Sequence, residues 1–459
     1  MRPGRIAQTF VATAAAGVFL AGCGGSSPLL TGKQTQQTNV QGQLKGGQQP
    51  IVGATLQLYA VGTGGYGSAA SPLFSPAITT DSNGNFTFPS GYCSAHPGAL
   101  VYLVGTGGQP AGAGSNVTNN NEALMVALGP CNSTNLNAST HISVNELTTV
   151  AAVWALAPFM SGTTNAYLNI GSPTSNATGL ALAFNAAQQV VSTSSGSIGG
   201  TALPSGAVLP TAEITTLADI LGYCINSGGG TEGDGSNCGK LFGDAPDTAG
   251  TAYPTDTITA AMNIAENPAR NVTPLFNMAA AKPVFQTPLS SPPTAWTVAI
   301  QYSGGGLSAP TAIAADQAGN IWVTNSGSPA TVSEFDNLGN SKLGTGVTIA
   351  AGIPTGIAID LSGNAWITVS SANSLFELSS SGTLGTAITT DLHQPTSVAI
   401  DGGGLVWVVN SDSTSGNSVS VFTSAGMEVA HSPFSGGGIA SPAGIAINGN
   451  ANANCSDCN

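Results

Sequence analysis

Charged side chains are scarce in this chain. Asp, Glu, Lys and Arg make up 6% of its 459 residues, against roughly 25% in ordinary soluble proteins. The solvent face of a helix in a soluble enzyme usually carries Lys and Glu, so this composition argues against a helix-rich cytosolic enzyme. Gly, Ser, Thr, Asn and Ala take the surface positions instead, which favours short strands and many turns.

Basic residues are scarcer than acidic ones. The sequence holds eight Lys and Arg against 21 Asp and Glu, a formal net charge of −13. Two of the eight, Arg2 and Arg5, lie at the very start, and the other six are scattered along the chain. Six scattered cations form no basic patch for nucleic acid or for electrostatic attraction to an anionic bilayer. Nucleic-acid binding is therefore excluded as a function.

Known catalytic motifs are also missing. The sequence contains no Gly-x-Ser-x-Gly, no His-Glu-x-x-His and no P-loop. Its four histidines, His96, His141, His393 and His431, are far apart in the sequence. We therefore expect no catalytic residues, no metal ligands and no cofactor, and a non-catalytic role is favoured over an enzyme.

The first 23 residues have three parts. Arg2 and Arg5 give a positive start, and residues 10–21 form an uncharged apolar run that is too short to span a bilayer. The run ends in Leu-Ala-Gly-Cys at Cys23, which resembles the lipobox of bacterial lipoproteins. This resemblance implies a signal peptide at 1–22 and lipid chains, including palmitate, on Cys23. An ordinary secretory signal with a chance cysteine is the alternative.

Two further features follow the anchored cysteine. Gly24, rather than Asp, resembles the outer-membrane sorting class of lipoproteins, with the protein on the periplasmic or the surface face. Residues 23–38 are rich in Gly, Ser, Gln and Thr, which is typical of a flexible tether.

The remaining six cysteines form an even set, which suits export to an oxidising compartment. One pair brackets two apolar runs, a second closes a Gly-rich loop, and the last is a Cys-x-x-Cys. A redox pair and half a metal site are alternatives for the last one. We expect two disulfides, Cys93–Cys131 and Cys224–Cys238. For Cys455–Cys458 a disulfide is expected beside the two alternatives just named.

Residues 39–131 alternate between apolar and polar positions, as half-buried strands do. We expect strands at 40–44, 50–59, 80–88, 99–104 and 124–128. Their order and motifs resemble the carboxypeptidase regulatory-like, prealbumin-type β-sandwich. The run Asp81–Asn85 predicts a tight hairpin turn, and a calcium loop is disfavoured because the later ligands are missing.

Residues 132–285 change to a helical period. Apolar stripes within 147–154, 180–191, 214–224 and 258–265 predict amphipathic helices that pack as a small bundle. We assign Ser143–Glu146 as the capping box of the first helix. Residues 286–309 are predicted to be a linker followed by a leading strand at Thr297–Tyr302.

An internal repeat occupies residues 310–459. Pro310–Asp316 recurs as Pro354–Asp360 and Pro395–Asp401, and Pro442–Asn448 opens a fourth copy. The prolines are 44, 41 and 47 residues apart, which is typical of propeller blades. The pattern resembles NHL-type repeats and the related repeats of the streptogramin-lyase family.

Each full copy carries an aspartate and, six residues later, a tryptophan. We expect the aspartates to cap the turn between the first two strands and the tryptophans to pack between neighbouring repeats. The identical offset in every copy favours a structural role over a ligand site. These residues are Asp316, Asp360 and Asp401 with Trp322, Trp366 and Trp407.

Together these patterns predict a multidomain, mainly β protein. It has an N-terminal β-sandwich, a central small helical bundle and a C-terminal partial β-propeller of three full repeats plus one strand. We expect a lipid-anchored membrane protein that binds a glycan or another protein through its repeats. Two alternatives stay open: a streptogramin-lyase-like metal-dependent lyase, with only His393 and His431 as candidate histidines, and a truncated fragment without activity of its own.

Overall fold

The structure is a computed structural model that describes residues 39–132, 136–137, 139–412 and 416–447. Cys23 and the leader lie outside the described residues, as do Cys455 and Cys458. Within the described ranges, none of the helices combines the length and the apolar character that crossing a membrane requires.

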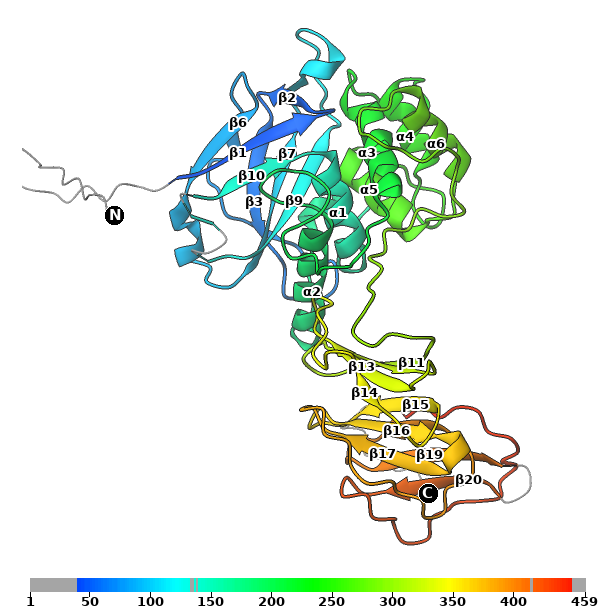
Figure 1. The fold of residues 1–459 in the computed structure, drawn as a ribbon. Coiled ribbons are helices and arrows are strands. Elements are labelled where there is room, and N and C mark those ends of the chain that lie inside the picture. Colours follow the sequence, from blue (N-terminus) through cyan, green and yellow to red (C-terminus); the bar gives the residue numbers. More distant parts are fainter. Residues whose placement is uncertain (1–38, 133–135, 138, 413–415, 448–459) are drawn as a thin grey trace, which may run out of the picture. The chain divides into compact units, whose positions relative to one another are not determined.

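Two five-stranded sheets form the N-terminal part, coloured blue to cyan in Figure 1. The first sheet has the order β10-β1-β2-β8, with β6 also paired to β1; the second has the order β4-β3-β7-β9, with β5 also paired to β3. Val40 and Leu44 of β1 are buried between exposed or half-buried neighbours, as the alternation predicts. The strands are β1 Asn39–Gly46, β2 Gln49–Val52, β3 Thr55–Ala60, β4 Ser71–Pro72, β5 Ile78–Thr79, β6 Asn85–Pro89, β7 Leu100–Thr106, β8 Gln109–Pro110, β9 Ala123–Pro130 and β10 His141–Val144.

The turn at Asp81 does not close a hairpin, contrary to the prediction. One carboxylate oxygen of Asp81 accepts the amides of Asn83 and Asn85, each at 2.8 Å, which is the expected turn chemistry. However, β5 before the turn pairs with β3, whereas β6 after it pairs with β1. The turn therefore carries the chain from one sheet to the other.

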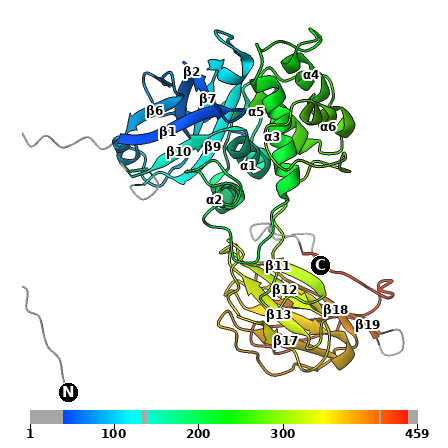
Figure 2. The ribbon, with the colours of Figure 1, turned by 45° about the horizontal axis from the view of Figure 1, so that its top comes forward.

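Six α-helices follow, coloured green in Figure 1. α1 and α2 pack against β9, and α3 packs against α1 (Figure 2). The helices are α1 Glu146–Leu156, α2 Ala177–Val190, α3 Thr211–Ile225, α4 Asn237–Asp244, α5 Thr257–Glu266 and α6 Val272–Ala281, and single turns of 3-10 helix occur at Ser90–Ser94, Ala111–Ala113, Ala157–Phe159, Ala166–Leu168 and Thr174–Asn176.

Sheets and helices share one hydrophobic core, so the expected boundary at residue 131 does not separate two cores. β10 lies beyond that boundary and pairs in parallel with β1. A single cluster of buried side chains runs from Val40 in β1 through Phe184 in α2 to Trp296. α1, α2 and α5 pack on β9, whereas α3, α4 and α6 pack on other helices, so the helical region is joined to the sandwich within one core.

Two local assignments also need correction. The capping box of α1 is formed by Asn145 and Thr148, because Ser143 is still part of β10. Residues 297–302 are not a strand of the repeat region: Val298 and Ile300 pack against the sandwich core. In both cases a contact with a segment distant in the sequence determines the local structure: Ser143 pairs with β1, and residues 298 and 300 pack on the sandwich core.

The structure joins Cys93 to Cys131 and Cys224 to Cys238. The first bond links the 3-10 turn after β6 to the end of β9, and the second links α3 to α4. All four cysteines are buried. Both crosslinks thus tie peripheral segments to the shared core.

The C-terminal part consists of three antiparallel sheets, which we call repeats 1, 2 and 3. In each repeat the first strand pairs with the second in the same register, with an irregularity after the initial proline. Repeat 1 is β11 Pro310–Ala315, β12 Ile321–Asn325, β13 Thr331–Phe335 and β14 Val347–Thr348; repeat 2 is β15 Pro354–Ile359, β16 Ala365–Val369 and β17 Ser374–Leu378, with a 3-10 turn at Ser370–Ala372; repeat 3 is β18 Pro395–Ile400, β19 Val406–Asp412 and β20 Gly416–Phe422.

Several carboxyl groups are buried in the shared core. Glu146 is fully buried, and one of its oxygens accepts the Gly47 amide at 2.6 Å while the other has no hydrogen-bond partner. Neither carboxyl oxygen of the buried Glu122 has a partner. Burial raises the pKa of Glu146 to about 8 and raises the pKa of Glu122 well above its ordinary value. At pH 7 the carboxyl of Glu146 is therefore mainly protonated.

This burial predicts that the protein loses stability as the pH rises from about 5 to 8. The folded state holds a proton on Glu146 that the unfolded chain releases near its ordinary pKa, so the free energy of unfolding falls through this window by about 1 kcal/mol per pH unit. Glu146→Gln keeps the acceptor for Gly47 but cannot ionise, and its thermal unfolding should depend less on pH. Glu232→Gln, at an exposed position, is the control that should match the wild type. Equal pH profiles for Glu146→Gln and wild type would rule out the assignment.

Candidate functional site

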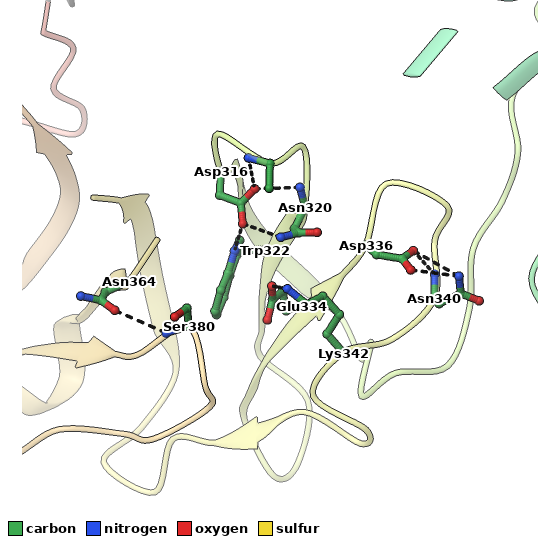
Figure 3. A network of polar contacts seen from close by, with 10 residues as sticks. Asp316, Asn320, Trp322, Glu334, Asp336, Asn340, Lys342, Asn364 and Ser380 are labelled. Carbon is green, nitrogen blue, oxygen red and sulfur yellow. Dashed lines mark hydrogen bonds and ion pairs between the residues drawn. The ribbon is translucent and has the colours of Figure 1, made fainter. Parts of the chain in front are cut away.

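The recurring aspartates each close a turn within their own repeat. In repeat 1, one oxygen of Asp316 accepts the amides of Ala318 and Asn320, and the other accepts the Asn320 side chain and the Trp322 indole (Figure 3). Burial alone would raise the pKa of Asp316, but these hydrogen bonds outweigh it and lower the pKa below its ordinary value. Asp316 is thus held in place as an ionised turn residue.

The same arrangement recurs in repeats 2 and 3. Asp360 accepts the amides of Ser362 and Asn364 and the Trp366 indole, the last at 3.2 Å. Asp401 accepts two amides in the same way, and the Trp407 indole at 2.9 Å. Because each carboxylate is bound within its own turn, the structure does not bring the three aspartates together.

Two of the three tryptophans, Trp322 and Trp366, pack at contacts between repeats. Trp322 belongs to a buried cluster with Ile357 and Ile367 of repeat 2, and Trp366 to a cluster with Val398 and Val408 of repeat 3. Both indoles are fully buried. Trp407 of repeat 3 is only half-buried and stacks on Phe434, with ring centroids 6.3 Å apart. Trp322 and Trp366 are thus buried between two described repeats, whereas Trp407 is partly exposed and stacks within repeat 3.

A threonine after each initial proline links one repeat to the next. The hydroxyl oxygen of Thr311 lies 3.1 Å from the Pro354 carbonyl oxygen, and that of Thr355 lies 2.9 Å from the Pro395 carbonyl oxygen. Thr396 makes the same contact with Pro442 at 3.3 Å. Residues 442–447 form no strand, and in this segment the contact with repeat 3 is made by Pro442.

A cleft opens at one end of repeats 2 and 3, with a volume of about 410 Å³. We call it the repeat cleft. It lies where β16 turns into β17 and where the chain enters β15 and β18, at the end of β16 opposite the Asp360 turn. It is lined by Ile353, Thr355, Ser370, Ser371, Asn373 and Gln394.

A hydrogen bond between a side chain and the backbone joins two residues of the repeat cleft, and the lining carries no charge. Asn373 and Gln394 both adopt left-handed backbone angles, with φ of 51° and 47°, and the Asn373 side chain accepts the Gln394 amide at 2.7 Å. Ile353, an apolar residue, is 51% exposed. The lining offers hydroxyl and amide groups beside one apolar side chain, which suits binding by hydrogen bonds and contact rather than acid–base chemistry.

The histidines do not form part of this cleft. His393 lies next to Gln394, and its backbone amide donates to Asn410. His431 lies in the loop after β20, with a left-handed φ of 71°. Among the described residues, no group of three or more His, Cys, Asp and Glu side chains is arranged to hold a metal ion.

Comparisons with known proteins give partial matches. No protein-family model matches the sequence, and no curated protein matches it. Solved structures with partial similarity include a streptogramin B lyase, with 20% identity over 30% of this chain and 44% of that chain and a TM-score of 0.26. A catalytically inactive virginiamycin B lyase from Staphylococcus aureus with quinupristin has 15% identity over 32% and 47%, with a TM-score of 0.27.

A third partial match is a nidogen/laminin complex, with 16% identity over 32% of this chain and 55% of that chain and a TM-score of 0.27. This chain thus spans about half the length of the solved structures that it matches. At this level of similarity the matches say nothing about activity.

The turn geometry predicts that Asp360→Ala destabilises the protein by about 1–3 kcal/mol, because two amides, the Asn364 side chain and an indole lose their acceptor. Asp360→Asn keeps one acceptor oxygen and should lose less. Asp336→Ala, in a turn of repeat 1 that binds no tryptophan, is a control that should also lose less.

Thermal unfolding with and without a chelator provides the measurement for these variants. The chelator should shift none of the melting temperatures. A large drop in the wild type that disappears in Asp360→Ala would show instead that the carboxylate holds a metal ion.

Proposed function

We propose that this protein is a membrane-anchored, non-catalytic binding protein that uses its repeats as a platform. The observation that carries the proposal is the repeat cleft, a cavity between two repeats whose lining combines hydroxyl, amide and apolar groups. The cleft lining contains no acidic or basic side chain, and the carboxylates of Asp360 and Asp401 lie at the opposite ends of β15 and β18, each engaged in its own turn. A lining of this kind supports binding of a ligand without catalysis of a reaction.

A glycan is the ligand that the lining favours. Thr355, Ser370 and Ser371 offer hydroxyls, and Asn373 and Gln394 offer amides, which are groups that pair with sugar hydroxyls in either direction. The exposed side chain of Ile353 gives an apolar surface for the C–H face of a sugar ring. With no charged residue in the lining, the cleft suits a neutral saccharide better than an acidic one.

The anchor fits this role. A lipid on Cys23 would hold the chain at a membrane, and residues 24–38 would separate the folded part from the bilayer. A binding platform gains from such attachment, because it presents its cleft at a fixed surface.

The cleft predicts binding of neutral rather than acidic oligosaccharides. Purified protein is applied to an array of neutral hexosamine and hexose oligomers beside heparin fragments. Positive neutral sugars are then titrated against the wild type and against Ser371→Trp, in which an indole fills the cleft from an exposed position. We expect affinity to fall at least tenfold in this variant.

Ser362→Trp is the matched control, because Ser362 is exposed in the turn at the other end of β16. It should bind as the wild type does. The proposal fails if the array shows no neutral ligand, or if both tryptophan variants bind as well as the wild type.

The lipobox predicts that Cys23→Ser releases the protein from the membrane, because the variant lacks the thiol to which the proposed lipid is attached. Cell fractionation of wild type and variant measures this, with Cys93→Ser as a control for a cysteine outside the lipobox. A Cys23→Ser protein that stays in the membrane pellet would refute lipid anchoring at this residue.

A further inference from the structure

A second cleft, on the sandwich and helical part, contains one of the few basic residues of the chain. Lys45 of β1 is half-buried and lines a cavity of about 290 Å³. No acidic side chain lines this cavity. Among the described residues, the ion pair that the structure contains joins Lys342 to Glu334. Lys45 therefore has no carboxylate partner in this part of the chain. We call this cavity the Lys45 cleft.

Three segments that are distant in the sequence build the Lys45 cleft. The first is the β1–β2 turn, where Gly47 and Gln48 take left-handed φ angles of 57° and 65°. The second is the start of α1 at Asn145, and the third is the loop 192–197. The chain between these segments runs through the shared core, so the walls are fixed by tertiary packing.

The loop 192–197 is held closely against α1. The side-chain nitrogen of Asn145 donates to the Gly196 carbonyl oxygen at 2.9 Å, and the Ser143 hydroxyl donates to the Ser194 carbonyl oxygen at 2.9 Å. A Cβ on Gly196 would lie 2.6 Å from the Asn145 side chain, and its φ is 68°. Only glycine therefore allows this approach.

The walls of the Lys45 cleft also carry hydroxyl groups. The hydroxyls of Ser195 and Ser197 lie 2.7 Å apart, so one hydrogen joins them and the other remains available. Gln43 and Gln48 also line the cavity, but each of their side-chain amides already donates a hydrogen bond to a backbone carbonyl, that of Asn83 and that of Val284. The ammonium group and the serine hydroxyl complement an anion that accepts hydrogen bonds.

The buried acid that contacts the β1–β2 turn does not cancel the charge of Lys45. Glu146 binds the Gly47 amide two residues from Lys45. Because burial raises the pKa of Glu146 to about 8, its carboxyl is neutral at pH 7. Among the residues that line this cleft, Lys45 is then the one with a charged side chain.

We propose that the Lys45 cleft is a binding site for a small organic carboxylate. The ammonium of Lys45 pairs with the carboxylate, and the Ser195–Ser197 hydroxyl pair donates the additional hydrogen bond. This site is separate from the repeat cleft and does not depend on the proposed glycan binding.

N-acetylalanine is the probe that tests this proposal, and N-acetylalanine amide is its neutral counterpart. Ligand-observed NMR titration of the full chain should show saturable binding of the carboxylate and at least about tenfold weaker binding of the amide. Lys45→Met keeps the aliphatic stem and removes the charge, so it should weaken carboxylate binding about tenfold or more. Lys45→Arg should restore it.

Lys240→Met, at an exposed position on α4, is the control that should bind as the wild type does. Equal binding of acid and amide, unchanged binding in Lys45→Met, or no binding of N-acetylalanine would each overturn the proposal. Tighter binding of inorganic phosphate than of N-acetylalanine would overturn the assignment to a carboxylate. Binding of neutral sugars to the repeat cleft is unaffected by any of these outcomes.

Discussion

A side-chain carboxylate that closes a tight turn is the contact on which both parts of this protein depend. One oxygen of the aspartate accepts the amides two and four residues further on, which fixes where the next strand begins. In the three repeats the other oxygen also holds an indole, so the turn and the tryptophan are oriented together. The turns are at Asp81, Asp316, Asp336, Asp360 and Asp401.

The hydrogen bonds of the turn aspartates explain why much of the repeat structure can be predicted from the sequence. Asp360, Gly363 and Trp366 all lie within one turn and one strand, so their geometry depends on neighbours in the sequence. Trp322 contacts residues of repeat 2 that are more distant in the sequence. This contact can still be predicted from the repeat pattern, because Trp366 contacts repeat 3 in the same way. Short-range chemistry that is repeated can be predicted without knowledge of the tertiary fold.

The features that the sequence does not predict depend on distant contacts. The sequence of β10 does not by itself predict a strand, because the segment becomes a strand through its parallel pairing with β1. Ser143 matches a capping pattern, but pairing with β1 makes it a strand residue and leaves Asn145 as the cap. The two clefts are missed for the same reason: nothing in the sequence relates Lys45 to Ser195, or Ile353 to Gln394.

The scarcity of charge limits how either cleft can recognise a ligand. Burial raises the pKa of both Glu122 and Glu146, the carboxyl of Glu146 is mainly neutral at pH 7, and the turn aspartates are bound to amides. The net charge of −13 nevertheless repels an approaching anion, so Lys45 cannot attract one over a long distance. Recognition of a carboxylate must therefore come from contact with Lys45 and the serine hydroxyls. The repeat cleft has no charged lining at all, so a ligand there depends on hydrogen bonds and shape alone.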